Sequence, residues 1–444
     1  MLSITPSTTN SQSSGFQLSD LSSTERIIYW AIILTPVWWL LGIQPLFYPA
    51  VAIALLIKSF DIDKVIQGSL PGCVWTWLAM AVVMFWTAVL GLNEMGWPIQ
   101  ETLAAGVTFI KSYFFIFACL ALPFWSRLRV NVITRAVVWL TIGYLITTCI
   151  QMLLLVVGIR NAVLTPLLAR LIPGDKSSLL IVLASVQPFF GIPLPRTVLY
   201  TPDPPILGIC AVLSFFICLG ETNPRLRTCA YCGSLCAMLV SFSRLAWICL
   251  PLGLLIIACL QSSLMRQVYL WLATLTFSIC SFKGLNVGEL LNKPLEIFNQ
   301  ARASSSADRS LVVSKTLEAW QEKPWLGWGV IRGTARLYEN VHITLGSFST
   351  YAAVLYLNGV VGFIVFILAL LLTLFFFYPE AVSGNAFCQR AFACLIILYV
   401  QINATPLSWM AVFLWFFFLW LGAVMQEAQR NNLVSSNWED TLRT

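Results

Sequence analysis

Long apolar runs dominate this sequence and leave few folds open to it. The runs lie at residues 27–43, 46–57, 73–92, 102–124, 137–157, 206–219, 228–240, 245–260, 268–282, 350–378, 391–402 and 407–425. A helix needs about 20 apolar residues to cross a bilayer. Only 10% of the 444 residues are charged, against about 25% in soluble domains. We therefore predict an all-α polytopic membrane protein with about 12 transmembrane segments.

Polar stretches divide the chain into one transmembrane bundle and its flanking parts. Residues 1–25 are rich in Ser and Thr and lack the pattern of a cleavable signal peptide, so we predict a disordered polar segment. The bundle is predicted over residues 26–425, and a polar tail over 426–444. Long loops are expected at about 158–205 and 283–345. Prolines from Pro193 onward argue against a spanning helix in the first loop, so a re-entrant or interfacial segment is expected there.

The short loops predict the orientation of the bundle. Lysine and arginine gather in one set of short loops, whereas the opposite turns, at Gln44 and at 93–101, carry neither. This pattern places both termini in the cytoplasm and the two long loops outside. Because long loops determine topology only weakly, their own positive charge needs another explanation, and an anionic partner supplies one.

The loop at 283–345 is the candidate site, because it concentrates charge in an apolar chain. Arg302 and Arg309 lie around the start of a predicted helix, which Asp308 is expected to cap and which would rest on the membrane surface. His342 is the only histidine in the chain. Its unperturbed pKa lies near neutrality, so catalytic and structural roles both stay open for it.

Arg244 is a further candidate, at the outer end of a tight turn between two apolar runs. An arginine at this depth usually has a partner, so it fits an anion site. It fits equally well an interfacial arginine that reaches to lipid headgroups.

Metal, cofactor and nucleotide chemistry find little support in the sequence. Most of the 13 cysteines fall in apolar runs, and the single C-x-x-C, at 229–232, has no histidine nearby. The acidic pair Asp61 and Asp63 falls on the predicted cytoplasmic side. There is no Gly-rich phosphate loop. We therefore predict no metal and no cofactor, and expect no nucleic acid among the partners.

Three motifs in the second half of the chain resemble the O-antigen ligase and polymerase superfamily of bacterial envelope enzymes. The first is the Ser-Arg at 243–244. The second is Arg302 and Arg309 ahead of P-W-L-G-W-G at 324–329, and the third is G-S-F-S-T-Y at 346–351 followed by N-G-V-V-G at 358–362. The likeness covers about residues 206–378 and implies a helical bundle like that of GT-C glycosyltransferases, in a bacterial cytoplasmic membrane.

The resemblance implies transfer of a glycan from an undecaprenyl-pyrophosphate carrier to an acceptor hydroxyl at the outer face of the membrane. It places Arg244, Arg302 and Arg309 on the pyrophosphate, without a metal, and His342 as a tentative base. It also makes Trp325, Trp328, Ser347 and Tyr351 candidate substrate-binding residues, although packing at the interface suits the two tryptophans as well. The partners implied are the lipid-linked donor, an acceptor glycan or lipid, and membrane lipids.

The chain departs from the family at one position, and this leaves alternatives open. The family's usual histidine is Phe348 here, and His342 lies six residues earlier. Either His342 takes over the role of base, or the protein uses no histidine base. Ligase and polymerase activities also stay open, because they differ only in the acceptor. A transporter or flippase for a lipid-linked oligosaccharide or small anion is the alternative from another class.

Overall fold

The computed structural model describes residues 18–63, 70–168, 179–189, 192–282, 303–337 and 341–443. The helices of the first half are η1 (Leu18–Asp20), α1 (Ser23–Ile33), α2 (Thr35–Leu41), α3 (Gln44–Ser59), α5 (Gly72–Glu94), α6 (Ile99–Lys111), α7 (Tyr113–Ser126), α8 (Val130–Val156) and α9 (Pro204–Cys218). Those of the second half are α10 (Pro224–Ser241), α11 (Arg244–Gln261), α12 (Ser263–Phe282), α14 (Ala303–Gln321), α15 (Thr350–Val382), α16 (Ala386–Gln401), α17 (Leu407–Met410) and α18 (Trp415–Arg443).

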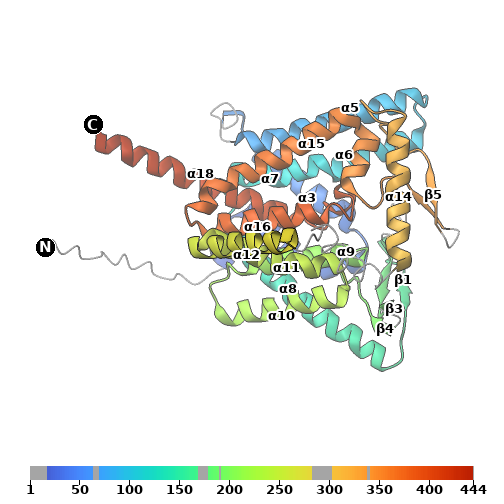
Figure 1. Ribbon diagram of the computed structural model, residues 1–444, viewed down its shortest axis with the longest axis horizontal. Coiled ribbons are helices and arrows are strands. Elements are labelled where there is room, and N and C mark those ends of the chain that lie inside the picture. The colour runs from blue at the N-terminus through green and yellow to red at the C-terminus, as the bar shows by residue number, and fades with distance from the viewer. Residues whose placement is uncertain are drawn as a thin grey trace.

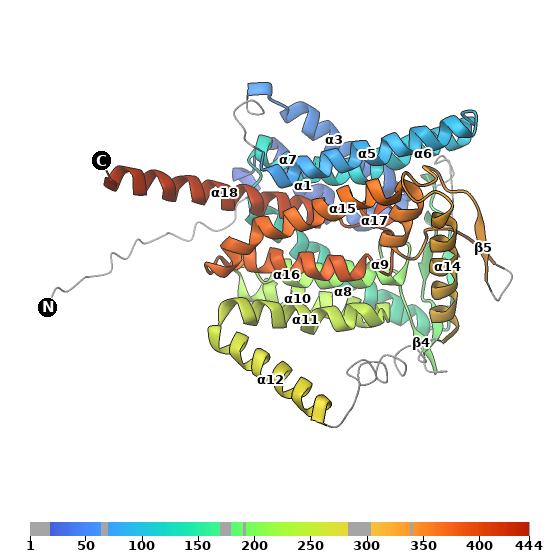
Figure 2. The same ribbon diagram turned by 45° about the horizontal axis from the view of Figure 1, so that its top comes forward.

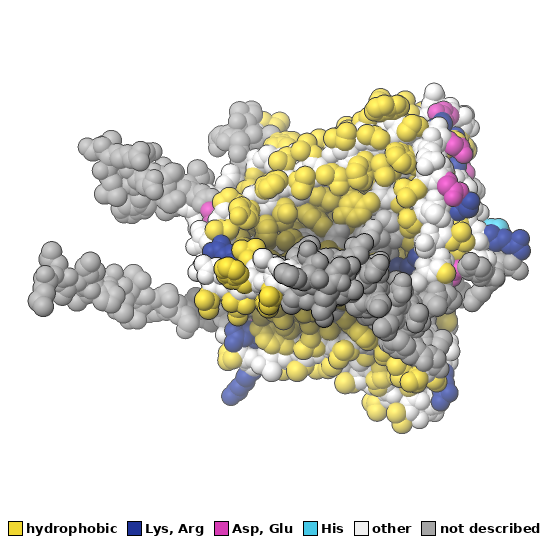
Figure 3. Space-filling model, in the orientation of Figure 1, with side chains coloured by type: hydrophobic (Ala, Val, Ile, Leu, Met, Phe, Trp, Pro, Cys, Tyr) yellow, Lys and Arg dark blue, Asp and Glu magenta, His cyan; other side chains and the backbone are white. Residues whose placement is uncertain are grey.

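The helices form one bundle whose two ends differ (Figure 1). The last helix, α18, projects from one end, and α14 lies at the opposite end with the short strands. Figure 2 shows that α12 diverges from the bundle. Hydrophobic side chains cover the middle of the face in Figure 3, and most charged side chains on it lie toward the two ends. This distribution suits a bundle that crosses a membrane.

Five helical stretches of the described chain are long and apolar enough to span a bilayer: Gly72–Glu94, Ile99–Ser126, Val130–Val156, Arg244–Gln261 and Thr350–Val382. Three shorter apolar helices are α3, α9 and α16. The all-α membrane character is confirmed in this coarse sense, whereas the count of about 12 spans stays a prediction. The run at 102–124 is broken, because the backbone leaves the helical region at Ser112, between α6 and α7.

The first half of α18 lies at the centre of the bundle. Its residues from Trp415 to Met425 are buried, and the helix contacts α7, α8, α9 and α16. The Trp415 ring stacks on Tyr48 of α3 at 4.6 Å between centroids. At Gly422 an added Cβ would lie 2.5 Å from the Leu120 carbonyl oxygen, so glycine allows α18 and α7 to approach. The last apolar run of the sequence therefore forms the centre of the helical bundle.

Two ion pairs hold helices together at the end from which α18 projects. Arg129 binds Glu25 of α1 through two guanidinium nitrogens, at 2.7 and 2.9 Å. Burial alone would raise the pKa of Glu25, but hydrogen bonds from Arg129 and Ser22 hold it below its usual value. In the second pair, Arg135 of α8 donates to the buried Glu221, which follows α9. Its Nη2 lies 2.6 Å from Oε1 and its Nε lies 2.7 Å from Oε2. Bidentate pairs of this kind fix orientation as well as distance.

The ion pair at Glu25 corrects one boundary of the predicted N-terminal segment. Residues 18–25, which we expected within a disordered stretch, form η1 and the first turn of α1. The Ser22 hydroxyl accepts from the Glu25 N–H, and the Glu25 carboxylate accepts from the Ser22 N–H. This reciprocal pair satisfies two free donors at the start of the helix. The remaining predicted disorder, at 1–17, falls outside the described residues.

Short antiparallel hairpins form in the first long loop, where we expected a re-entrant or interfacial segment. Strand β1 (Ala162–Leu164) pairs with β2 (Ile181–Leu183), and β3 (Val186–Phe189) pairs with β4 (Ile192–Pro195). A third hairpin, β5 (Thr334–Arg336) with β6 (His342–Thr344), lies in the second loop. Proline is tolerated in an edge strand but not inside a helix, which suits Pro193 and Pro195 to β4. The described chain is therefore mostly helical, and the three short hairpins are a minor addition to the all-α bundle that we predicted.

Candidate functional site

The P-W-L-G-W-G loop at 324–329 fastens onto a break in α15. The helix breaks at Gly359, whose φ of 63° and ψ of −167° are not helical. The break exposes the carbonyls of Tyr356 and Leu357, which accept from the N–H groups of Trp328 and Gly329 at 2.9 and 2.7 Å. On the other side of the break, the N–H groups at 360 and 361 donate to the carbonyls at 324 and 325. The loop therefore supplies the hydrogen bonds that the helix has lost.

The glycines of this motif permit close approach of backbones. Gly329 has φ +72°, and a Cβ there would lie 2.2 Å from the Thr87 carbonyl oxygen of α5. At Gly91 of α5 an added Cβ would lie 2.3 Å from the Trp328 carbonyl oxygen. At Gly327 it would meet the Leu357 backbone at 2.5 Å. The motif is thus a three-way junction of the loop, α5 and α15, which indicates a structural role for these glycines.

Trp328 belongs to this junction. Its Nε1 donates to the Ala319 carbonyl at 2.8 Å, and two cations flank its ring, Lys323 at 4.6 Å and Arg332 at 5.1 Å from the centroid. Lys323 also binds Glu94 of α5, and Arg332 reaches the same carboxylate at 3.1 Å. These contacts favour the packing role that we kept open for Trp328. Trp325, by contrast, is 71% exposed.

The G-S-F-S-T-Y motif fastens the start of α15 to the turn at 402–407. The Thr350 N–H donates to the Ile402 carbonyl at 2.8 Å, and the Thr350 hydroxyl donates to the Thr405 carbonyl and accepts from the Leu407 N–H, each at 2.8 Å. The buried Thr350 therefore makes hydrogen bonds with three residues of that turn, Ile402, Thr405 and Leu407.

The two candidate substrate-binding residues of this motif are engaged within the protein. Tyr351 donates its hydroxyl to the Tyr399 carbonyl at 2.9 Å. The Ser347 hydroxyl donates to the Thr344 carbonyl at 2.6 Å. Tyr351 is thereby tied to α16, and Ser347 to the end of β6. Both contacts are structural, and neither joins these residues to an arginine of the site.

Arg309 projects from α14 onto the same turn. Its Nη1 donates to the Ala404 carbonyl at 2.9 Å, and its guanidinium carbon lies 4.9 Å from the centre of the Phe348 ring. Within the described chain Ala404 is its only hydrogen-bond partner, and a guanidinium has five N–H donors. Phe348, the residue that we expected at the position of the family's histidine, therefore lies against an arginine. Cation and ring at this separation attract each other.

Arg244 meets α14 one helical turn away from Arg309. Arg244 is the first residue of α11, and its Nη2 donates to the Ser306 hydroxyl at 2.9 Å. Ser306 and Arg309 are three residues apart in α14, which places them side by side on one helix face. The structure therefore brings two of the three predicted arginines to one face of α14. The third, Arg302, lies outside the described residues.

The N-terminus of α11 lies at Arg244. Ser243, the N-cap residue, makes no side-chain capping hydrogen bond. The first N–H groups of a helix have no partner within it, and such groups with the helix dipole favour an anion.

The structure corrects the predicted start of the helix that carries Arg309. It begins at Ala303, so Asp308 lies inside α14 instead of capping it. The Asp308 Oδ1 is buried and has no hydrogen-bond partner in the described part of the chain. Buried carboxylate oxygens normally accept a hydrogen bond, so this oxygen is a candidate to accept a hydrogen bond from a ligand.

His342 lies apart from this group of residues. It is exposed on the β5–β6 hairpin, opposite Arg336, and its Nδ1 is 3.4 Å from the Thr334 hydroxyl. No contact among the described residues joins it to Arg244 or Arg309.

Arg196 is a site neighbour that the sequence analysis missed. It is 9% exposed, and its Nε donates to the Ser241 carbonyl at 3.1 Å. The next residue, Thr197, donates its N–H to the Val240 carbonyl at 3.1 Å. Together they supply hydrogen bonds to two carbonyls at the C-terminus of α10, directly before the turn that leads to Arg244. A charged residue inside a Pro-rich apolar segment was the signal that could have indicated it.

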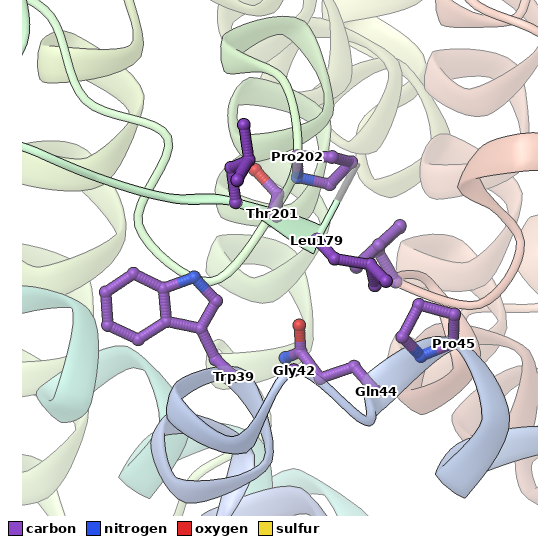
Figure 4. Close-up of a pocket in the computed structure, with 9 residues that line it drawn as sticks. Trp39, Gly42, Gln44, Pro45, Leu179, Thr201 and Pro202 are labelled. Carbon is purple, nitrogen blue, oxygen red and sulfur yellow. The ribbon is translucent and has the colours of Figure 1, made fainter. Parts of the chain in front are cut away.

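A small cavity at the junction between α2 and α3 is too small for a sugar. It lies between Trp39, Gln44, Leu179 and Thr201, and the Gln44 amide extends into it (Figure 4). Its volume of about 10 Å³ is near the minimum that holds one water molecule. We therefore place no substrate there.

Residues 229–367 match the model of a protein family described as O-Antigen ligase. The chain resembles the O-antigen ligase and polymerase superfamily. The match covers less than half of the chain, from α10 into α15, and includes Arg244, Arg309 and Phe348. A search of curated proteins finds no match. The family match supports a glycan ligase or polymerase role in general, with a lipid-linked glycan and an acceptor as partners, in a bacterial membrane.

Proposed function

We propose that this protein transfers a glycan from an undecaprenyl-pyrophosphate carrier to an acceptor hydroxyl at the outer face of the bacterial cytoplasmic membrane. The contact that carries the proposal is the convergence of Arg244 and Arg309 on one face of α14. Both arginines lie within the region that resembles the O-antigen ligase family. The N- and C-termini are then cytoplasmic, and α14 faces outward.

The arginines would act on the leaving group. The acceptor oxygen attacks the anomeric carbon, the bond from that carbon to the pyrophosphate oxygen breaks, and undecaprenyl pyrophosphate leaves with the electron pair. Arg309, held by Ala404 and Phe348, would stabilise the negative charge that grows on the leaving pyrophosphate. The start of α11 and Arg244 would bind the same group. Arginines are suited to this role, which would make a metal unnecessary.

The hydroxyl proton must also leave, and two groups are candidates to accept it. His342 is the sequence-based candidate. Asp308 is the structural one, because it precedes Arg309 and its buried Oδ1 lacks a partner in the described chain. A base must lie within hydrogen-bond reach of the proton that it takes. We favour Asp308, because it lies on the helix that carries Arg309.

Replacement of His342 by alanine is therefore expected to change turnover less than about threefold, whereas Asp308→Asn should lower it by about 10² to 10⁴, the usual contribution of a general base. The matched comparison uses initial transfer rates at equal amounts of folded protein. A large loss in His342→Ala with a near-normal Asp308→Asn would restore His342 as the base.

The orientation can be tested with single cysteines placed at exposed positions. Ser310 of α14 and Asn431 of α18 are exposed at opposite ends of the bundle. In a background without native cysteines, Ser310→Cys should react with an impermeant maleimide in intact spheroplasts, and Asn431→Cys only after lysis. The reverse labelling pattern would contradict the proposal, since the lipid-linked donor is used outside.

The glycan profile of a strain lacking this protein tests the activity in cells. We expect either loss of chain length, which indicates a polymerase, or polymer that stays on its lipid carrier, which indicates a ligase. Restoration by the wild-type chain but not by Arg309→Ala would assign the change to this site. An unchanged surface glycan and lipid-linked pool would contradict a transferase and favour transport.

A further inference from the structure

A groove of about 360 Å³ lies on the face formed by α1, α2 and α3. It arises at a bend, because α1 ends at Ile33 and the Thr35-Pro36 pair starts α2. Pockets that hold small ligands measure about 300–1,000 Å³, so the groove can accept part of a lipid. Its lining includes Arg26, Ile27, Trp30, Leu34, Trp38 and Phe47.

Apart from Arg26, the lining of the groove is apolar, and it includes the rings of Trp30, Trp38 and Phe47. The Trp38 and Phe47 rings stack at 4.1 Å between centroids. The Trp38 Nε1 donates to the Ala31 carbonyl at 3.1 Å, so the indole presents no free donor to the groove. Trp30 is 44% exposed and forms part of the wall. Within α1 the stretch from Arg26 to Ile33 rises by roughly 10 Å, at about 1.5 Å per residue, and the lining continues past the bend to Trp38, which suits an acyl chain.

Arg26 places a single positive charge in this lining. Its side chain is exposed, and it makes no hydrogen bond or ion pair with any residue that the structure describes. The adjacent Glu25 does not neutralise it, because that carboxylate is engaged by Arg129 and Ser22. Arg26 also lies at the end of the bundle from which α18 projects. Its neighbour Glu25 binds Arg129, which directly precedes α8. Close by in sequence to Arg129, the Pro123 carbonyl accepts a hydrogen bond from Gln426 of α18.

We propose that this groove binds one anionic phospholipid. Arg26 holds the headgroup phosphate, and one acyl chain follows Ile27, Trp30 and Leu34 toward the Trp38–Phe47 stack. A guanidinium and a phosphate form charge-assisted, often bidentate, hydrogen bonds. A headgroup with its own ammonium would partly cancel that attraction, so an anionic lipid is preferred. This site is separate from Arg244 and Arg309 and does not depend on the proposed glycan transfer.

Native mass spectrometry of the full chain can test this with phosphatidylglycerol and phosphatidylcholine of identical acyl chains. The wild type should retain one phosphatidylglycerol in preference to phosphatidylcholine. Arg26→Gln should weaken phosphatidylglycerol retention about tenfold, as expected for a lost charged hydrogen bond. The matched control is Arg225→Gln, an exposed arginine at the same end of the bundle, which should retain the lipid. Leu34→Trp, which fills the groove, should reduce binding of both lipids.

Three results would overturn the proposal. They are equal retention by the wild type and Arg26→Gln, an equal loss in Arg225→Gln, and displacement of phosphatidylglycerol by an equimolar amount of undecaprenyl phosphate. The last would assign the groove to the isoprenoid carrier. Size-exclusion profiles of each variant show whether it is folded, and Arg26→Gln changes only an exposed side chain. A negative result with that variant therefore counts against the lipid site itself.

Discussion

Arg309→Lys is expected to lower glycan-transfer turnover by about 30- to 1,000-fold, which corresponds to roughly 2–4 kcal/mol of transition-state stabilisation. Arg309 makes two contacts that lysine cannot make together: a hydrogen bond to the Ala404 carbonyl and a stack over Phe348. An ammonium is a point charge without the planar fork that binds two phosphate oxygens. The measurement is the initial rate with purified protein and a lipid-linked donor.

The matched control is Lys315→Met, a charge removed from the same helix. Lys315 is exposed and pairs with Glu318 at 2.7 Å on the surface of α14. Surface pairs of this kind contribute little, so turnover should stay within about twofold of wild type. An unchanged rate in Arg309→Lys, at equal amounts of folded protein, would remove Arg309 from the site.

Gly329→Ala is expected to destabilise the fold, by roughly 2–5 kcal/mol from the sum of a left-handed alanine and an overpacked junction. The added Cβ would lie 2.2 Å from the Thr87 carbonyl oxygen and 2.9 Å from the Gly91 Cα. Both are backbone atoms of α5, so relief requires movement of a whole helix. The readouts are the yield of monodisperse protein and its Tm in detergent.

Gly106→Ala is the control for this substitution. Gly106 lies within α6, and an added Cβ there meets nothing within 4 Å. Alanine in a helix interior should be neutral or stabilising by about 0.5–1 kcal/mol. If Gly329→Ala matched Gly106→Ala in yield and Tm, the three-way junction of loop, α5 and α15 would be wrong.

The sequence predicted the motifs of this junction but not its geometry. P-W-L-G-W-G and N-G-V-V-G were visible as patterns typical of a family. Their contact with Thr87 and Gly91 joins segments more than 200 residues apart, and hydropathy carries no signal for such pairing. The break at Gly359 was hidden as well, because the apolar run continues through it. The loop at 324–329 supplies the hydrogen bonds that the helix has lost there.

The arginines show a similar limit. Their residue type and loop position predicted Arg244 and Arg309 as candidates, and the structure joins them through α14. The choice of His342 rested on its being the only histidine, a property of composition that says nothing about distance. Our prediction started α14 at Asp308, because Ser304, Ser305 and Ser306 are typical of a loop. The helix in fact starts at Ala303, so Asp308 is an interior residue and not its N-cap.

Release of the carrier by the purified protein tests the central claim most directly. In proteoliposomes that contain a lipid-linked glycan and an acceptor, undecaprenyl pyrophosphate and newly formed glycosidic bonds can be counted together. We predict equal amounts of the two, abolished in Arg309→Ala and retained in Lys315→Met. An intact donor that crosses the bilayer without release of undecaprenyl pyrophosphate would contradict a transferase and identify a transporter.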